Sequence, residues 1–289
     1  MNRPNRKVCL TTKMDKPQDL KSALAGKLNP KELGELITSY DRLGNLIIIE
    51  VPSTLLKKAK LIGETLLSAH PGVRTVCMKN GIHGGTYRTQ KLKVIAGKRT
   101  KEADYFESGV KIRLHAEKVF FSPRLSSERL RIAKMVMPGE RVLVMFSGCG
   151  PYQMVIGRAQ KLCIVEGVEL NAIGHKYAEI NKELNRLSNV INHLGDVRKV
   201  VPKLGAFDRV IMALPKDAPE FLDVGLPAVK KGGIVHLYSF AHEEEFALEA
   251  ARIVEICKGL GRIVKSTGVY KCGAYKPHVF RVCVDLICQ

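Results

Sequence analysis

Apolar and polar positions along the chain predict short strands that alternate with helices. Apolar runs of roughly five residues are followed by stretches with helical spacing, which is typical of strands joined by helices. The expected strands are 45–51, 73–78, 87–96, 110–121, 142–146, 162–168, 190–194, 209–214 and 233–239; the expected helices are 53–68, 126–137 (with Ser126 as its cap), 152–158, 173–187, 218–230 and 243–259. Because helical crossovers join parallel strands, residues from 140 onward predict a parallel sheet covered by helices.

The last two apolar segments, 262–270 and 278–287, have no room for a helix between them. They are therefore expected to pair antiparallel at the sheet edge. A Rossmann-like α/β sheet that ends in such a hairpin is the layout of class I S-adenosylmethionine-dependent methyltransferases rather than of nicotinamide dehydrogenases. We expect a basic N-terminal arm at 1–36, a smaller mixed α/β domain at 37–122 and the domain with the larger sheet at 123–289.

The charge balance indicates a polyanionic partner. The 289 residues include 47 Lys and Arg against 28 Asp and Glu, a net charge of +19. About +15 of this charge lies before Pro138. We therefore expect the part of the chain before Pro138, its basic front, to bind the polyanion and the part after it to bind a small ligand. No apolar stretch approaches the roughly 20 residues of a membrane span, and no signal peptide is evident, so we expect a cytosolic protein without a membrane partner.

The cysteine and aromatic contents narrow the chemistry further. The eight cysteines contain no C-x-x-C pair and often sit in apolar runs, which favours free thiols in a reducing compartment and argues against a zinc site. We therefore expect no metal. Trp is absent and aromatic residues make up 6% of the chain, so few side chains are available to stack on bases. The candidates for base stacking are Tyr87, Phe120, Phe121 and Tyr152.

Three loops at one predicted sheet edge suggest a nucleoside cofactor. Ser147-Gly148-Cys149-Gly150 follows the strand 142–146, and Glu169 ends the next strand, where a carboxylate can accept ribose hydroxyls. Asp196 ends the strand after that, and Glu166 is an alternative to Glu169 for the ribose. A third glycine is missing from the loop, which disfavours a pyrophosphate cofactor. The expected cofactor-binding residues are Phe146, Ser147, Gly148, Gly150, Glu169, Leu170, Asp196 and Val197.

Four segments carry a resemblance to a known family. They are 83–92 (HGGTYRTQKL), 120–129 (FFSPRLSSER), 145–151 (MFSGCGP) and 212–215 (MALP). In this order and spacing they resemble the archaeal and eukaryotic tRNA guanine-37 N1-methyltransferases, and the resemblance covers about residues 36–289. It implies S-adenosyl-L-methionine as cofactor and the anticodon loop of tRNA as partner, with 37–122 as the tRNA-binding domain and 123–289 as the S-adenosylmethionine-binding methyltransferase domain.

The resemblance also implies roles for individual residues. Glu128 would remove the N1 proton of guanine, and Arg88 would stabilise the negative charge that develops on O6. Packing of the extruded base would involve Phe120 and Pro215. The full expected substrate-binding set is Phe120, Arg124, Arg129, Ala213, Leu214 and Pro215.

Departures from the family pattern leave two alternatives open. Val144 stands where the family usually has an acid, and Ala213 stands where an Asn often precedes Leu-Pro. The family's N-terminal domain that binds the tRNA elbow is expected to be missing or reduced to residues 1–36. The alternatives are transfer of the aminocarboxypropyl group of the same cofactor, as in wybutosine biosynthesis, and a non-catalytic tRNA-binding protein.

Overall fold

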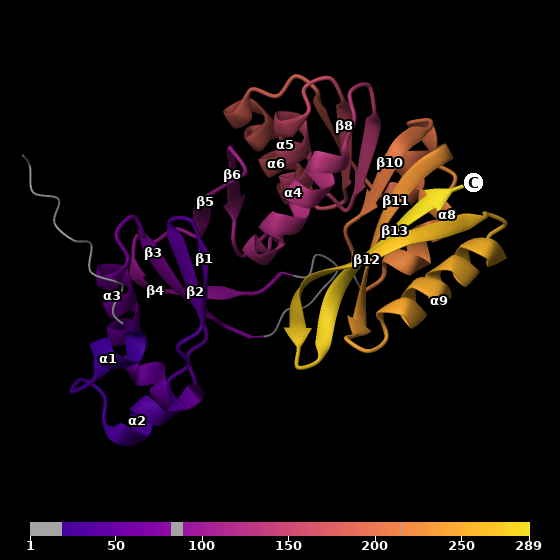
Figure 1. Ribbon diagram of the computed structural model, residues 1–289. Helices are drawn as coiled ribbons and strands as arrows, with labels where there is room; N and C mark the ends of the chain where they lie inside the picture. The colour runs from indigo at the N-terminus through magenta and orange to yellow at the C-terminus, as the bar shows by residue number, and fades with distance from the viewer. Residues whose placement is uncertain (1–18, 82–88, 215) are drawn as a thin grey trace, which may run out of the picture.

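The computed structural model describes residues 19–81, 89–214 and 216–289, and within them the chain builds two sheets and a separate two-stranded ribbon (Figure 1). The first sheet has the order β1-β2-β3-β4, with β2 and β3 parallel and the other pairs antiparallel. The helices and strands of this part of the chain are α1 (Leu20–Leu24), α2 (Pro30–Glu35), β1 (Tyr40–Leu43), β2 (Leu46–Ile49), η1 (Ser53–Lys58), α3 (Ala59–Ala69), β3 (Thr75–Lys79) and β4 (Leu92–Gly97).

The N-terminal helices pack onto this first sheet. Leu20, Leu24 and Leu28 are buried in one core with Ile47 and Ile62 of β2 and α3. Asn29 caps α2 and Glu32 bonds back to its backbone, a capping box that fixes the start of this short helix. Residues 20–36 therefore belong to the first packed unit, while the boundaries expected after residues 36 and 122 stay predictions.

The ribbon of β5 (Glu102–Glu107) and β6 (Val110–His115) connects the two sheets. The turn between β1 and β2 presses against it, because a Cβ on Gly44, which has φ +56°, would lie 1.8 Å from the carbonyl oxygen of Asp104. On its other side, Asn181 and Asn185 of α6 hydrogen-bond the backbone of β6. The chain continues with η2 (Pro123–Leu125) and α4 (Ser126–Met135). The N-cap of α4 is Leu125 rather than the expected Ser126.

The second sheet has the order β12-β13-β11-β10-β7-β8-β9. The strands β9, β8, β7, β10 and β11 are parallel, and the C-terminal hairpin is antiparallel at the edge, which confirms the expected architecture. The elements are β7 (Arg141–Met145), α5 (Pro151–Ala159), β8 (Ile164–Glu169), α6 (Ala172–Asn185), β9 (Val190–Leu194), α7 (Val197–Val200), η3 (Val201–Lys203), β10 (Phe207–Met212), η4 (Ala218–Phe221), α8 (Leu222–Gly225), β11 (Val229–His242), α9 (Phe246–Gly259), β12 (Val264–Lys276) and β13 (Val279–Cys288).

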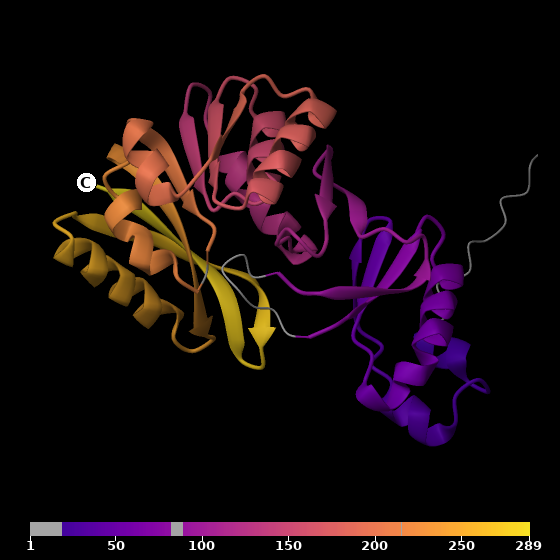
Figure 2. The ribbon, with the colours of Figure 1, turned by 180° about the vertical axis from the view of Figure 1, so that it is seen from behind.

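Helices cover both faces of this sheet (Figure 2). One core packs α4, α5 and α6 against it, and the other packs α8 and α9. The single helix expected at 218–230 is wrong, because η4 and α8 end at Gly225 and β11 already pairs with β10 at Val229. The seven described cysteines are buried free thiols. Among the described residues, no helix is both long enough and apolar enough to span a bilayer.

Candidate functional site

The loop after β7 turns sharply at the carboxyl edge of the sheet. Phe146 has φ +60°, a left-handed conformation that is uncommon for a residue with a side chain and that clusters at functional sites. Gly148 and Gly150 have φ +57° and +80°, and a Cβ on Gly150 would lie 3.3 Å from that of Ala178. Because β7 pairs with both β8 and β10, this loop opens at the point where the strand order reverses, which is where ligands bind in such sheets.

Glu169 faces this loop from the end of β8. Its Oε2 accepts a hydrogen bond from the backbone N of Gly148 at 2.6 Å, and its Oε1 accepts one from Asn171 N at 2.7 Å. Burial raises the pKa of Glu169, and these N–H groups oppose the rise. Each oxygen keeps a further lone pair for a ligand hydroxyl. The alternative residue, Glu166, instead bonds Arg141 and His193, so the structure favours Glu169.

The third loop follows β9 and closes the same edge. The backbone N of Gly195 donates to the carbonyl of Glu169 at 2.9 Å, which ties the two loops together. Asp196 is half-buried and caps α7 by accepting from Arg198 N. Val197 is buried, and Leu170 is 48% exposed beside Glu169.

The glycine-rich loop carries two side chains with reactive or polar groups, Cys149 and Ser147. Burial raises the pKa of Cys149 to about 12, so this thiol is not a nucleophile at neutral pH. The hydroxyl of Ser147 is buried and has no hydrogen-bond partner within the described part of the chain. A buried polar atom of this kind normally has a partner, so it is available to a bound ligand.

Phe120 connects this edge of the sheet to a cavity. A Cβ on Gly148 would lie 3.4 Å from the carbonyl oxygen of Phe120, whose side chain is 41% exposed. The cavity holds about 280 Å³ and is lined by Phe120, Arg124, residues of β1 to β4 and residues of the C-terminal hairpin. Arg124 bonds Asp41 of β1 at 2.8 Å, an exposed ion pair of small energetic value.

Arg129 does not face this cavity. It is 1% exposed, donates to Glu107 at 2.6 Å and to the carbonyl of Ser122 at 3.2 Å, and lies over the ring of Phe121. The structure therefore places Arg129 behind the acceptor segment, where it holds 120–125 against β5. Sequence alone gave no sign of Glu107 as its partner.

Glu128 is buried beneath the cavity wall. It is 4% exposed; its oxygens accept from Arg131 at 2.7 and 2.8 Å and from the hydroxyl of Tyr238 at 2.8 Å. Cys272, which lines the cavity, is close enough to Glu128 that their hydrogen bond adds to burial in raising the pKa of the thiol. Arg131 also donates to Asp285 at 2.7 Å. Sequence reasoning singled out Glu128 but not its partners Arg131, Tyr238 and Asp285.

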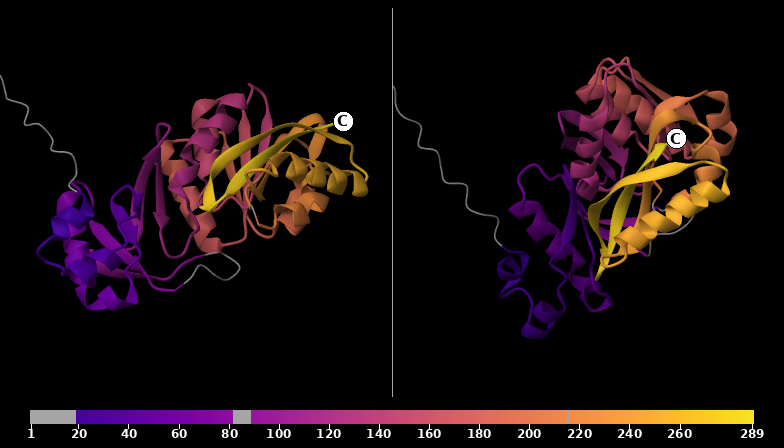
Figure 3. Two further views of the ribbon diagram at one scale, coloured as in Figure 1. Left: turned by 60° about the horizontal axis from the view of Figure 1, so that its bottom comes forward. Right: turned by 45° about the vertical axis from the view of Figure 1, so that its right-hand side comes forward.

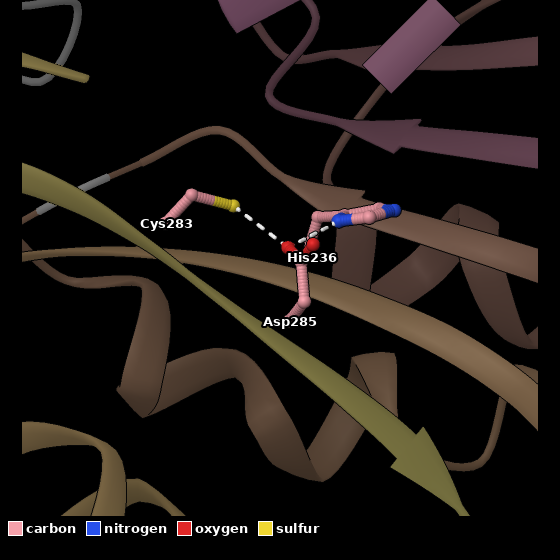
Figure 4. Close-up of side chains that lie close together, drawn as sticks. All are labelled: His236, Cys283 and Asp285. Carbon is pink, nitrogen blue, oxygen red and sulfur yellow. Dashed lines mark hydrogen bonds and ion pairs between the residues drawn. The ribbon is translucent and has the colours of Figure 1, made fainter. Parts of the chain in front are cut away.

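The chain of buried partners continues from Asp285 into the sheet (Figure 4). His236 Nδ1 lies 2.6 Å from Asp285, and its Nε2 lies 2.7 Å from Arg209. Since arginine only donates, Nε2 accepts and the proton of the neutral ring is on Nδ1. Burial lowers the pKa of His236, in agreement with a neutral ring. Cys283 donates to the same carboxylate, but the arginines on either side oppose a bound cation.

The remaining expected site residues lie on one loop or outside the described residues. Ala213 and Leu214 follow β10 and are half-buried against the two cores of the large sheet. Arg88 and Pro215, expected to bind the target base, lie outside the described residues. The structure thus brings together the cofactor set at one edge and Phe120 and Arg124 at the adjoining cavity.

The strand order and the three loops define a class I methyltransferase. The family described as TRM5/TYW2 methyltransferase domain matches residues 104–264, and the TYW2 N-terminal domain matches residues 20–100. The chain belongs to the TRM5/TYW2 methyltransferase family. Its S-adenosylmethionine fits the site, because Glu169 offers acceptors to a ribose, the glycine-rich loop turns sharply at the sheet edge beside it, and Ser147 has an unused hydroxyl.

Relatives in this family cover most of the chain. It is 38% identical to the tRNA (guanine(37)-N(1))-methyltransferase Trm5b of Pyrococcus abyssi, over 89% of this chain and 77% of the relative. It is 34% identical to the tRNA 4-demethylwyosine(37)-methyltransferase Taw21 of Saccharolobus solfataricus, over 84% of this chain and 91% of the relative.

Solved structures show the same fold. A complex of aTrm5 with tRNALeu superimposes with a TM-score of 0.82 at 26% identity and covers 98% of this chain and 82% of that one. The P. horikoshii TYW2 in complex with MeSAdo gives 0.78 at 25% identity, over 93% and 97%.

Proposed function

We propose that this protein transfers the methyl group of S-adenosylmethionine to N1 of guanine at position 37 of tRNA, as the name of its Pyrococcus relative indicates for that enzyme. The observation that carries the proposal is the junction at Phe120, where the carbonyl oxygen lies next to Gly148 of the cofactor loop and the ring lines the adjoining cavity. A base in that cavity would lie close to the cofactor loop. The basic front of the chain complements a tRNA backbone.

The proposed chemistry needs one proton transfer. S-adenosylmethionine supplies an electrophilic methyl group on a sulfonium. Glu128 takes the proton from N1. The freed nitrogen electron pair would then bond the methyl carbon while the bond from that carbon to the sulfonium sulfur breaks, which would release the rest of the cofactor as a neutral thioether. Arg131 and Tyr238 orient the carboxylate through their hydrogen bonds. Glu128 is 4% exposed and is hydrogen-bonded to Cys272 of the cavity wall, so its carboxylate must become accessible from the cavity before N1 can reach it.

Other residues of the proposal bind the substrate. Phe120 and Arg124 contact the base and a phosphate, Arg88 stabilises O6, and Leu214 and Pro215 pack beside the base. Ala213 has no side-chain hydrogen bond to offer a guanine. Arg129 supports the acceptor segment through Glu107. We further propose that the anticodon loop is the bound part of tRNA and that the enzyme acts in the cytoplasm, a reducing compartment that suits its free cysteines.

A second candidate is supported by the similarity to Taw21, whose name gives 4-demethylwyosine at position 37 as its target. Ala213 supports it as well, because the absence of an Asn there removes one means of discriminating guanine. Both candidates use the same cofactor and the same tRNA position, so they differ in the nature of the acceptor base.

One experiment separates these functions from each other and from the alternatives. Wild-type protein is incubated with tRNA bearing guanine or 4-demethylwyosine at position 37 and with cofactor labelled separately in its methyl and carboxypropyl carbons, and the nucleosides are mapped by mass. We expect methyl label on guanine 37, and none when position 37 is adenine. Methyl label only on 4-demethylwyosine would favour the second candidate. Carboxypropyl label would show aminocarboxypropyl transfer, and no label would favour a non-catalytic protein.

Replacing Glu169 is expected to weaken cofactor binding. Glu169→Gln removes the charge that accepts from a ribose hydroxyl and from Gly148 N, and a charged hydrogen bond is worth about 1.5 to 3 kcal/mol. The dissociation constant of S-adenosylmethionine measured by calorimetry should therefore rise about 10- to 150-fold. Glu166→Gln, on the same strand, is the matched control. Equal affinity in wild type and Glu169→Gln would contradict the ribose role.

A further inference from the structure

The C-terminal hairpin extends beyond the edge of the large sheet. β12 and β13 stay paired as far as Lys276 and Val279, and β12 contacts η2 of the acceptor segment. Figures 1 and 3 show the hairpin running past the ends of the parallel strands toward the smaller sheet. Residues near its tip therefore form one wall of the 280 Å³ cavity, opposite the small sheet.

Tyr275 is the most exposed aromatic residue on that wall. Its side chain is 61% exposed, and its ring stacks on Phe240 of β11 with centroids 4.1 Å apart and planes 30° apart. Phe240 covers one face of the tyrosine and holds it in place, so little conformational entropy is lost when a ring stacks on the other face. Phe120, 41% exposed, lines the same cavity from the acceptor segment.

The charges around this cavity favour a nucleic acid base with its phosphates. Lys79, Arg124 and Arg281 line it, and Asp41, already paired with Arg124, is the one carboxylate among the lining residues that the structure describes. Beyond the tip, Glu243 bonds His278, and two more glutamates follow it in the chain. An RNA backbone is therefore favoured beside Arg124 and Arg281 and repelled beside Glu243.

We propose that Tyr275 is a stacking residue for the acceptor base, so that Phe120 and Tyr275 bind the unpaired nucleobase at position 37 from two walls of one cavity. The proposal rests on the proposed function and adds to it a base-binding residue from the C-terminal hairpin. A cavity of 280 Å³ is at the small end of ligand pockets, which suits a single base rather than a longer stretch of RNA.

The test uses full-length protein and tRNA with 2-aminopurine at position 37, a base whose fluorescence is quenched by stacking. Tyr275→Ala should weaken binding of this tRNA about 5- to 150-fold, the range for loss of one stacked base, and should leave the bound 2-aminopurine brighter than in the wild-type complex. Tyr275→Phe keeps the ring and should match wild type. Phe106→Ala is the matched control, because Phe106 is 67% exposed and does not line the cavity.

The outcomes distinguish this proposal from the proposed function. Unchanged tRNA affinity and unchanged emission with Tyr275→Ala would overturn the stacking role even if wild-type protein methylates guanine 37. Weaker binding without a change in emission would also overturn it, since Tyr275 would then contact another nucleotide. Absence of methyl transfer by wild-type protein would contradict the proposed function, while the binding and emission data would still decide the role of Tyr275. Circular dichroism checks that each variant is folded.

Discussion

Glu128→Gln is expected to slow methyl transfer by about 10²- to 10⁴-fold, the contribution typical of a positioned general base. The amide has nearly the shape of the carboxylate and one oxygen that still accepts from Arg131 or Tyr238, but it cannot take the N1 proton. Single-turnover rates with saturating tRNA and S-adenosylmethionine measure the effect. Affinities for both should stay close to those of the wild type.

A matched variant separates the loss of the general base from the loss of a buried ion pair. Glu140 is bound by Arg209 with two hydrogen bonds of 2.9 and 3.0 Å, at the far end of the same network. Glu140→Gln should therefore weaken an equivalent pair and still transfer methyl groups at nearly the wild-type rate. Normal turnover by Glu128→Gln, or an equal loss in both variants, would remove Glu128 from the base role.

Asp285→Asn is expected to lower the free energy of unfolding by about 3 to 5 kcal/mol, the range for breaking a buried ion pair from one side. Both carboxylate oxygens of Asp285 accept hydrogen bonds, one from His236 and the other from Arg131. An asparagine would point its NH₂ group at one of these donors and leave Arg131 less well compensated. Urea unfolding at neutral pH measures the difference. Asp223→Asn, which loses an exposed pair with Arg198, should cost at most about 1 kcal/mol.

The effect of Asp285 also has a pH dependence with a defined sign. Burial alone would raise its pKa, but the hydrogen bonds from His236 and Arg131 outweigh burial and hold the pKa well below its usual range. The carboxylate therefore contributes its full stability above the ordinary Asp pKa of about 3.9, and this contribution is lost as the pH falls toward the lower folded value. The difference between wild type and Asp285→Asn should shrink below about pH 4. A constant difference down to pH 2 would contradict this linkage.

The cofactor edge could be predicted from sequence because it depends on a local rule. Parallel strands end at the same edge, so residues at their carboxyl ends, such as Gly148 and Glu169, meet whatever the details of packing. The antiparallel hairpin was predictable in the same way from the short connection before 278–287. The helix expected at 218–230 failed because strand pairing at Val229 overrides local helical spacing.

The acceptor side was predictable only as a set of residue types. Arg129 and Arg131 are two positions apart on α4, yet Arg129 pairs with Glu107 and Arg131 with Glu128 and Asp285. Helical spacing turns the two side chains to nearly opposite sides of α4, but it does not say which residues meet them there. Tyr275 shares a cavity with Phe120 because β12 of the hairpin contacts η2, which brings together residues far apart in the sequence.

The sequence by itself determined the alternation of strands and helices, the sheet edge that holds the cofactor loops, and the basic front of the chain. The tertiary structure alone decided which buried charges are partners and which walls enclose the acceptor cavity. Periodicity specifies which face of an element is buried, whereas a buried charge must be matched by whatever side chain the fold brings within hydrogen-bonding distance. For Arg131 and Asp285, that partner lies 154 positions away in the sequence.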